Sequence, residues 1–229
     1  ILDLTLKDRI ESAGYQTRAG VVAAARFLTM EFDKRIPYFY ENGRLNNYGE
    51  QKYVDGEGRY YHKGLYLNSS KFSTITVSYA GPAIWGCPLM NYEDAGIWKS
   101  NTLMPNGLDC SGFVTWTLIN GGFDIGDIGA GETPEPNQLT DQGERVLVTD
   151  ELINSGRVKV GDLIKLLGHI GIIIGIDDKQ TYYVAESLDT YYGLVVKEYK
   201  KEEMPDSWTY IMLMEDVYKN DGNLTNMWY

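Results

Sequence analysis

The chain has 229 residues, 43% hydrophobic and 23% charged, and is long enough to bury a substantial core as one large domain or one domain with an accessory region. Its formal net charge of −11 argues against non-specific binding to nucleic acid or to an anionic membrane surface. The longest apolar run, residues 170–176, is far too short to span a bilayer, so we expect no membrane insertion.

The first third of the chain combines a predicted helix with a polar region. Residues 6–32 are predicted to be helical, and residues 21–32 are Ala-rich and apolar on most sides, as in a buried helix. Residues 35–37 are expected to end it, because the residue before a proline leaves the α region. Residues 38–70 are rich in Gly and Tyr and indicate loops and short hairpins, whereas residues 73–79 alternate with period two and indicate one strand.

A second helix is predicted over residues 110–120. Asp109 is placed to act as its N-cap, and the Gly pair at 121–122 is placed to end it. Cys110 then lies at the positive end of the helix dipole, where the thiol pKa is lowered and free amides can hold an oxyanion. Because its neighbours Asp109 and Ser111 are polar, we interpret Cys110 as a nucleophile rather than a structural cysteine.

The last third predicts a meander of strands over residues 161–166, 168–176, 181–187, 193–199 and 209–218. His169 begins the second strand, and the pair at 177–178 is predicted to form the turn into the third. A two-residue turn places Glu186 directly opposite His169, and a four-residue loop moves the pairing by two positions but keeps the face. We therefore expect Glu186 to accept from the ring nitrogen facing away from Cys110 and to fix the tautomer.

Three ordered motifs together resemble the NlpC/P60 family of cell-wall cysteine peptidases over about residues 82–218: Asp-Cys-Ser-Gly-Phe-Val at 109–114, Gly-Asp-Leu at 161–163 and Gly-His-Ile-Gly-Ile-Ile-Ile-Gly at 168–175. The resemblance implies a papain-like α+β fold, in which a helix bearing the cysteine packs on an antiparallel sheet bearing the histidine. It implies hydrolysis of amide bonds in bacterial peptidoglycan stem peptides, usually between γ-D-glutamate and the following diamino acid. It implies neither a metal nor another cofactor.

The resemblance also implies roles for individual residues. Cys110 matches the nucleophile and His169 the general base and then acid. Glu186 falls at or near the third position, where many members have His, Asn or Gln. Asp109 and Ser111 match positions that in some members bind the free amine of the substrate.

The segment at residues 82–87 departs from the family. Members often carry Pro-Tyr-x-Trp-Gly-Gly ahead of the cysteine motif, and Trp85 and Gly86 agree with that pattern. Ala83 replaces the Tyr and Cys87 replaces a Gly. Trp85 is therefore a candidate substrate-binding residue, Cys87 is expected to be a packing residue, and substrate binding near the thiol is expected to differ from that of the family.

These features divide the chain into a helical and Tyr/Gly-rich extension, residues 1–81, packed on the core, and a catalytic domain, residues 82–229. No metal site is expected, since His62 has no Cys or His near it. The chain begins without Met, so we expect a processed or excised fragment of a longer bacterial protein, extracellular or associated with the cell wall. Two alternatives stay open: a papain-like amidase or acyltransferase that uses the same thioester, and a non-catalytic module that binds the cell wall.

Overall fold

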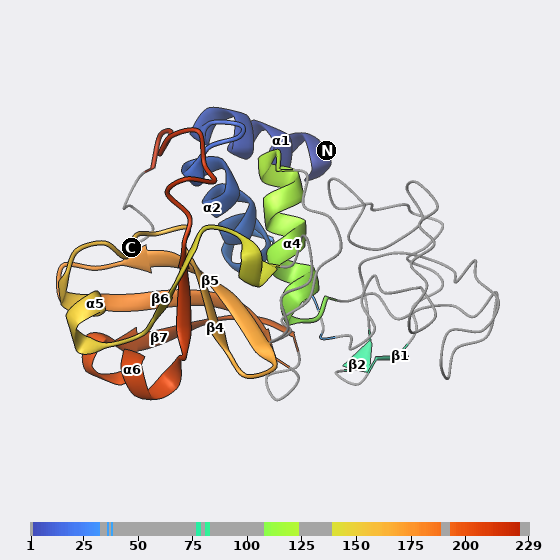
Figure 1. Cartoon of the computed structure of the whole chain (residues 1–229). Helices are drawn as coiled ribbons and strands as arrows, with labels where there is room; N and C mark the ends of the chain where they lie inside the picture. The colour runs from blue at the N-terminus through green and yellow to red at the C-terminus, as the bar shows by residue number, and fades with distance from the viewer. Residues whose placement is uncertain are drawn as a thin grey trace.

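A computed structural model describes residues 2–32, 36, 38, 77–78, 81–82, 108–123, 139–188 and 193–224. These residues form a mixed α+β fold with a six-stranded antiparallel sheet (Figure 1), which confirms the α+β class. Most of the predicted loop region at 38–70 lies outside the described residues, as do His62, Ala83, Trp85, Gly86 and Cys87. Of the strand predicted at 73–79, the structure describes β1 (Val77–Ser78), which pairs with β2 (Gly81–Pro82). Among the described helices, none has the length and apolar character that crossing a bilayer requires.

The N-terminal segment forms three helical elements: α1 (Leu2–Ala13), α2 (Arg18–Arg26) and the π-helical η1 (Phe27–Glu31). The helical character predicted for residues 6–32 is confirmed at 6–13 and 18–31, whereas the continuity of the helix is wrong. Gly14 has a φ of +123°, a conformation that ends α1 and that side chains rarely adopt. Thr17 then caps α2, since its side chain accepts a hydrogen bond from the amide of Gly20 at 3.3 Å.

The second helix is α4 (Cys110–Gly121), and all twelve of its residues are buried. Asp109 caps its first turn, and Gly122, with φ of 102°, ends it in the left-handed conformation, so the predicted helix and both of its boundary signals are confirmed. α4 packs closely on α2, because a Cβ at Gly121 would lie only 2.4 Å from Cγ2 of Val21. Figure 1 shows these two helices side by side over the sheet.

The large sheet has the strand order β3-β8-β4-β5-β6-β7. Its strands are β3 (Glu144–Leu147), β4 (Leu163–Leu166), β5 (His169–Ile176), β6 (Thr181–Leu188), β7 (Gly193–Lys200) and β8 (Tyr210–Leu213). The predicted meander is wrong for the last strand, which is shorter than 209–218 and inserts between β3 and β4 instead of following β7. Ile211 and Met212, on opposite faces of β8, are both fully buried. A strand in the interior of a sheet is covered on both faces, which explains why β8 lies inside the sheet and not at its edge.

The sheet separates two cores. On one face, Ile170, Ile172 and Ile174 of β5 pack with α1, α2 and α4. On the other face, Ile173 packs with α5 (Asp150–Asn154), α6 (Met204–Ser207) and Trp208. The first helices of the chain and the cysteine-bearing helix therefore share one core.

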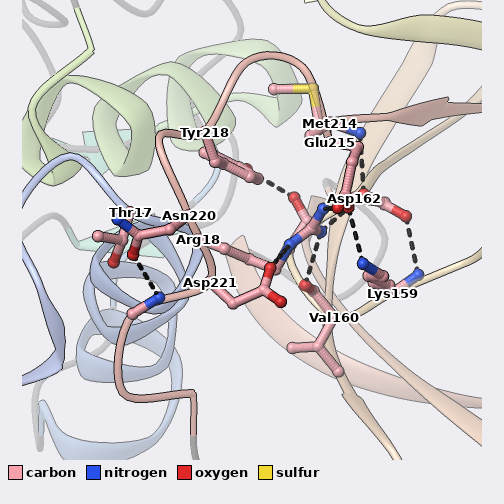
Figure 2. Close-up of polar contacts among 12 residues, drawn as sticks. Thr17, Arg18, Lys159, Val160, Asp162, Met214, Glu215, Tyr218, Asn220 and Asp221 are labelled. Carbon is pink, nitrogen blue, oxygen red and sulfur yellow. Dashed lines mark hydrogen bonds and ion pairs between the residues drawn. The ribbon is translucent and has the colours of Figure 1, made fainter.

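Arg18 ties α2 to the sheet and to the C-terminal segment (Figure 2). Its guanidinium is 1% exposed and donates to Asp162 at 2.8 Å, to Asp221 at 3.0 Å and to Glu215 at 3.2 Å. The ring of Tyr218 lies beneath it, with 5.0 Å from Cζ to the ring centroid. Asp162 belongs to the Gly-Asp-Leu motif. Through Arg18 this motif residue helps to hold together α2, the start of β4 and the C-terminal segment.

Candidate active site

Cys110 is the first residue of α4, and its surroundings are set by the cap. Asp109 accepts a hydrogen bond from the amide of Gly112 at 2.7 Å and from the hydroxyl of Ser111 at 3.3 Å, both on Oδ1. The amide of Phe113 donates to the Asp109 carbonyl. The first four amides of a helix have no partner within it, and here those of Cys110 and Ser111 are directed to the Cys110 thiol, where they lower its pKa.

The thiol is protonated in this arrangement. Burial, followed by the nearby charge of Asp109, raises the pKa of Cys110 to about 12, although the amides of Ile170, Ser111 and Cys110 itself act in the opposite direction. The predicted lowering of the thiol pKa is therefore wrong, because desolvation in the core outweighs the helix N-terminus. A thiol of this kind needs a base that removes its proton during attack.

The imidazole of His169 is bound to a buried carboxylate. Its Nε2 lies 2.6 Å from Oε2 of Glu186, and the two side chains are 15% and 1% exposed. Glu186 pairs with Gly171 and not with His169, so the predicted two-residue turn is wrong. The loop is longer, with the Gln180 amide donating to the Asp177 carbonyl, and the register shifts again between Ile173 and Gly175. The net shift of two positions keeps both side chains on one face.

Three further residues surround this pair. The hydroxyl of Tyr199 donates to Oε1 of Glu186 at 3.0 Å, and Nζ of Lys197 lies 4.0 Å from the same oxygen. The indole of Trp208 stacks on the imidazole, with 5.8 Å between ring centroids and 25° between planes. Sequence reasoning missed all three. Period-two alternation in β7 marks Tyr199 and Lys197 as sharing a face with Glu186, whereas Trp208 follows α6 and carried no such signal.

The structure places the thiol and the imidazole at the same strand start but on different sides of it. Side chains alternate along β5, so that of Ile170 packs in the core with α4 and that of His169 lies on the face of Glu186 and Trp208. The backbone amide of Ile170 acts on the Cys110 thiol. Between these two described residues, Cys110 and His169, there is no hydrogen bond. Predicted site residues are thus brought together in two sets, Asp109 with Cys110 and Ser111, and His169 with Glu186.

Comparisons of the chain with protein families, curated proteins and solved structures found no match. Within the described ranges, no group of three or more His, Cys, Asp or Glu side chains is placed to hold a metal ion. The candidate site therefore consists of the Cys110 thiol at the start of α4, beside β5, and the His169 imidazole, which is hydrogen-bonded to the buried carboxylate of Glu186.

Proposed function

We propose that this chain is a cysteine peptidase of the NlpC/P60 type, with a papain-like arrangement, that hydrolyses amide bonds in bacterial peptidoglycan stem peptides. One observation carries the proposal. At two successive residues of β5, the Ile170 amide meets the Cys110 thiol and the His169 ring meets the buried carboxylate of Glu186. In the proposal, Cys110 is the nucleophile, His169 is the base and Glu186 is the group that orients the base.

In the proposed mechanism the ring nitrogen that is not bonded to Glu186 acts as the base. An ionised carboxylate only accepts, so Nε2 of His169 carries the proton of that bond and Nδ1 is the acceptor. In the proposed reaction Nδ1 takes the proton of the Cys110 thiol as the sulfur attacks the carbonyl carbon of the scissile amide. The amides of Cys110 and Ser111, which point at the sulfur, then donate to the oxyanion.

The remaining steps return the site to its starting state. The imidazolium gives its proton to the leaving amine nitrogen as the carbon–nitrogen bond breaks, which leaves a thioester on Cys110. Water then attacks the thioester with His169 as base, and the sulfur recovers a proton as the acid product departs. Proton transfer in this scheme requires the Nδ1 edge of the ring to face the sulfur in the substrate complex.

The substrate class follows from the motif resemblance, and with it a location outside the cell or at the cell wall. Asp109 is the residue proposed to bind the free amine of a stem peptide. Its Oδ1 accepts hydrogen bonds from the amide of Gly112 and the hydroxyl of Ser111, so the carboxylate is held at the start of the helix beside the thiol. Trp85, the other proposed substrate-binding residue, belongs to the segment outside the described residues.

Purified peptidoglycan fragments, incubated with the native chain and with Cys110→Ala and analysed by mass spectrometry, test the proposal. We expect fragments ending at D-glutamate with the native chain and none with the variant. Products cut at another bond, still dependent on Cys110, retain the peptidase and reject the proposed bond. If fragments from several cell-wall chemotypes yield no product that depends on Cys110, the proposed function is rejected.

A further inference from the structure

Strand β6 contacts both halves of the candidate site through two adjacent residues. Glu186 holds His169 on one face of the sheet, as described above. Ser187 points to the other face, where its hydroxyl donates to the carbonyl of Leu108 at 2.6 Å. Leu108 lies two residues before Cys110, in the segment that leads into α4.

We propose that Ser187 is a positioning residue for the nucleophile, an inference that rests on the peptidase function proposed above. The hydroxyl of Ser187 is fully buried, and Leu108 is 1% exposed and belongs to the core beneath α4. A buried carbonyl that loses its donor in such a place is left unsatisfied, so the backbone moves to find another partner. That movement is transmitted through Asp109, the cap, to the Cys110 sulfur and its contact with Ile170.

The bond also sets the two halves of the site relative to each other. Glu186 and Ser187 are neighbours in β6. Glu186 holds the imidazole of His169 and Ser187 holds the Leu108 segment that leads to the thiol, so the same short piece of backbone positions both groups. A shift of the Leu108 segment changes the separation of sulfur and imidazole without touching the His169–Glu186 bond. Loss of the Ser187 hydrogen bond is therefore expected to slow those reactions that require the Cys110 thiol and the His169 imidazole together.

A purely structural role for Ser187 has a different consequence, and the chain offers a matched control. Thr117 lies two turns along α4 from Cys110, and its hydroxyl is also fully buried and also donates at 2.6 Å to a carbonyl, that of Val114. Thr117→Val removes this bond with little change of shape. If Ser187 only stabilises the fold, Ser187→Ala and Thr117→Val have the same kind of effect: a lower melting temperature with unchanged site geometry.

The test is the rate at which 1,3-dibromoacetone cross-links Cys110 to His169, followed by peptide mapping and measured well below the melting temperature of each protein. The reagent alkylates a thiol and then an imidazole within its short reach, so the rate reports their separation without any substrate. Because small misplacements strongly slow reactions between positioned groups, we expect Ser187→Ala to cross-link about tenfold more slowly than the native chain. Thr117→Val is expected to react at the native rate.

The outcomes separate this inference from the function on which it rests. Cross-linking of Ser187→Ala at the native rate overturns the positioning role and leaves the peptidase proposal standing. A native chain that is alkylated at Cys110 but never cross-linked to His169 overturns both, since no thiol–imidazole pair then exists to be positioned. If the native chain forms the cross-link but cuts no stem peptide, only the substrate assignment fails, and the Ser187→Ala rate still decides the inference.

Discussion

Replacing Arg18 with Met is expected to lower the free energy of unfolding by about 3–5 kcal/mol, because it leaves a buried carboxylate without its cation. Asp162 is 1% exposed and lies 2.8 Å from the guanidinium. Without Arg18 it retains the amides of Lys159 and Met214 as donors, but no other cation among the described residues forms an ion pair with it. Glu215 and Asp221 add little to the loss, since their side chains are 61% and 55% exposed and water takes over their solvation.

Urea denaturation of three variants measures the effect. Arg9→Met is the matched control, because Arg9 makes a similar contact with Glu31 at 2.7 Å, but with side chains 54% and 39% exposed. Its removal is expected to cost at most about 1 kcal/mol. Adding Asp162→Asn to Arg18→Met is expected to restore part of the loss, since the uncompensated charge is then gone. A cost for Arg18→Met no larger than that for Arg9→Met refutes the reasoning.

The remaining predictions concern the site and the helix that carries it. Asp109→Asn keeps a good N-cap but removes a charge that raises the pKa of Cys110, so iodoacetamide should label this thiol faster at a fixed alkaline pH; an unchanged rate contradicts this. Because the folded thiol has a pKa of about 12 against an ordinary 9.0, its contribution to stability is full below pH 9 and is lost as the pH rises toward 12. Burial also raises the pKa values of Tyr182 and Tyr218, so denaturation curves of Cys110→Ala should show a smaller loss than the native chain between pH 9 and 12, and an equal loss contradicts the assignment. Glu186→Gln should lower turnover of stem peptides about a hundredfold or more at unchanged fold, as judged by circular dichroism, and full activity argues against its orienting role. Gly121→Ala should cost about 1–3 kcal/mol in thermal denaturation, because the new Cβ would lie 2.4 Å from Val21; an unchanged melting temperature means that α2 and α4 pack less tightly.

The limits of the cysteine-bearing helix could be predicted from sequence because they depend on neighbours along the chain. Asp109 reaches an amide three residues ahead, and Gly122 ends the helix through its own backbone conformation. The same kind of local signal marked the start of β5 at His169. It did not mark the break at Gly14, because an isolated Gly does not by itself end a predicted helix.

The shared face of His169 and Glu186 was also predictable, although their pairing was not. Next to the turn Ile176 pairs with Tyr182, three positions from the predicted register, and the irregularity between Ile173 and Gly175 reduces the shift to two where Gly171 pairs with Glu186. Side chains alternate with period two along a strand, so this net shift of two changes which residues face each other but not which face they occupy. The assumed turn length failed because the Asp177 side chain accepts from the amides of Lys179 and Thr181, which favours a longer loop.

What the sequence determined by itself was local: the cap and end of α4, four of the sheet strands and the face on which the imidazole meets a carboxylate. Contacts between distant segments were decided by the tertiary structure, such as Arg18 with Asp162, 144 residues apart, and Ser187 with Leu108, 79 residues apart. The ionisation of Cys110 belongs to the second group as well. A helix N-terminus acts through neighbouring amides and can be read from the sequence, whereas desolvation depends on everything that packs around the sulfur, and here desolvation is the larger effect.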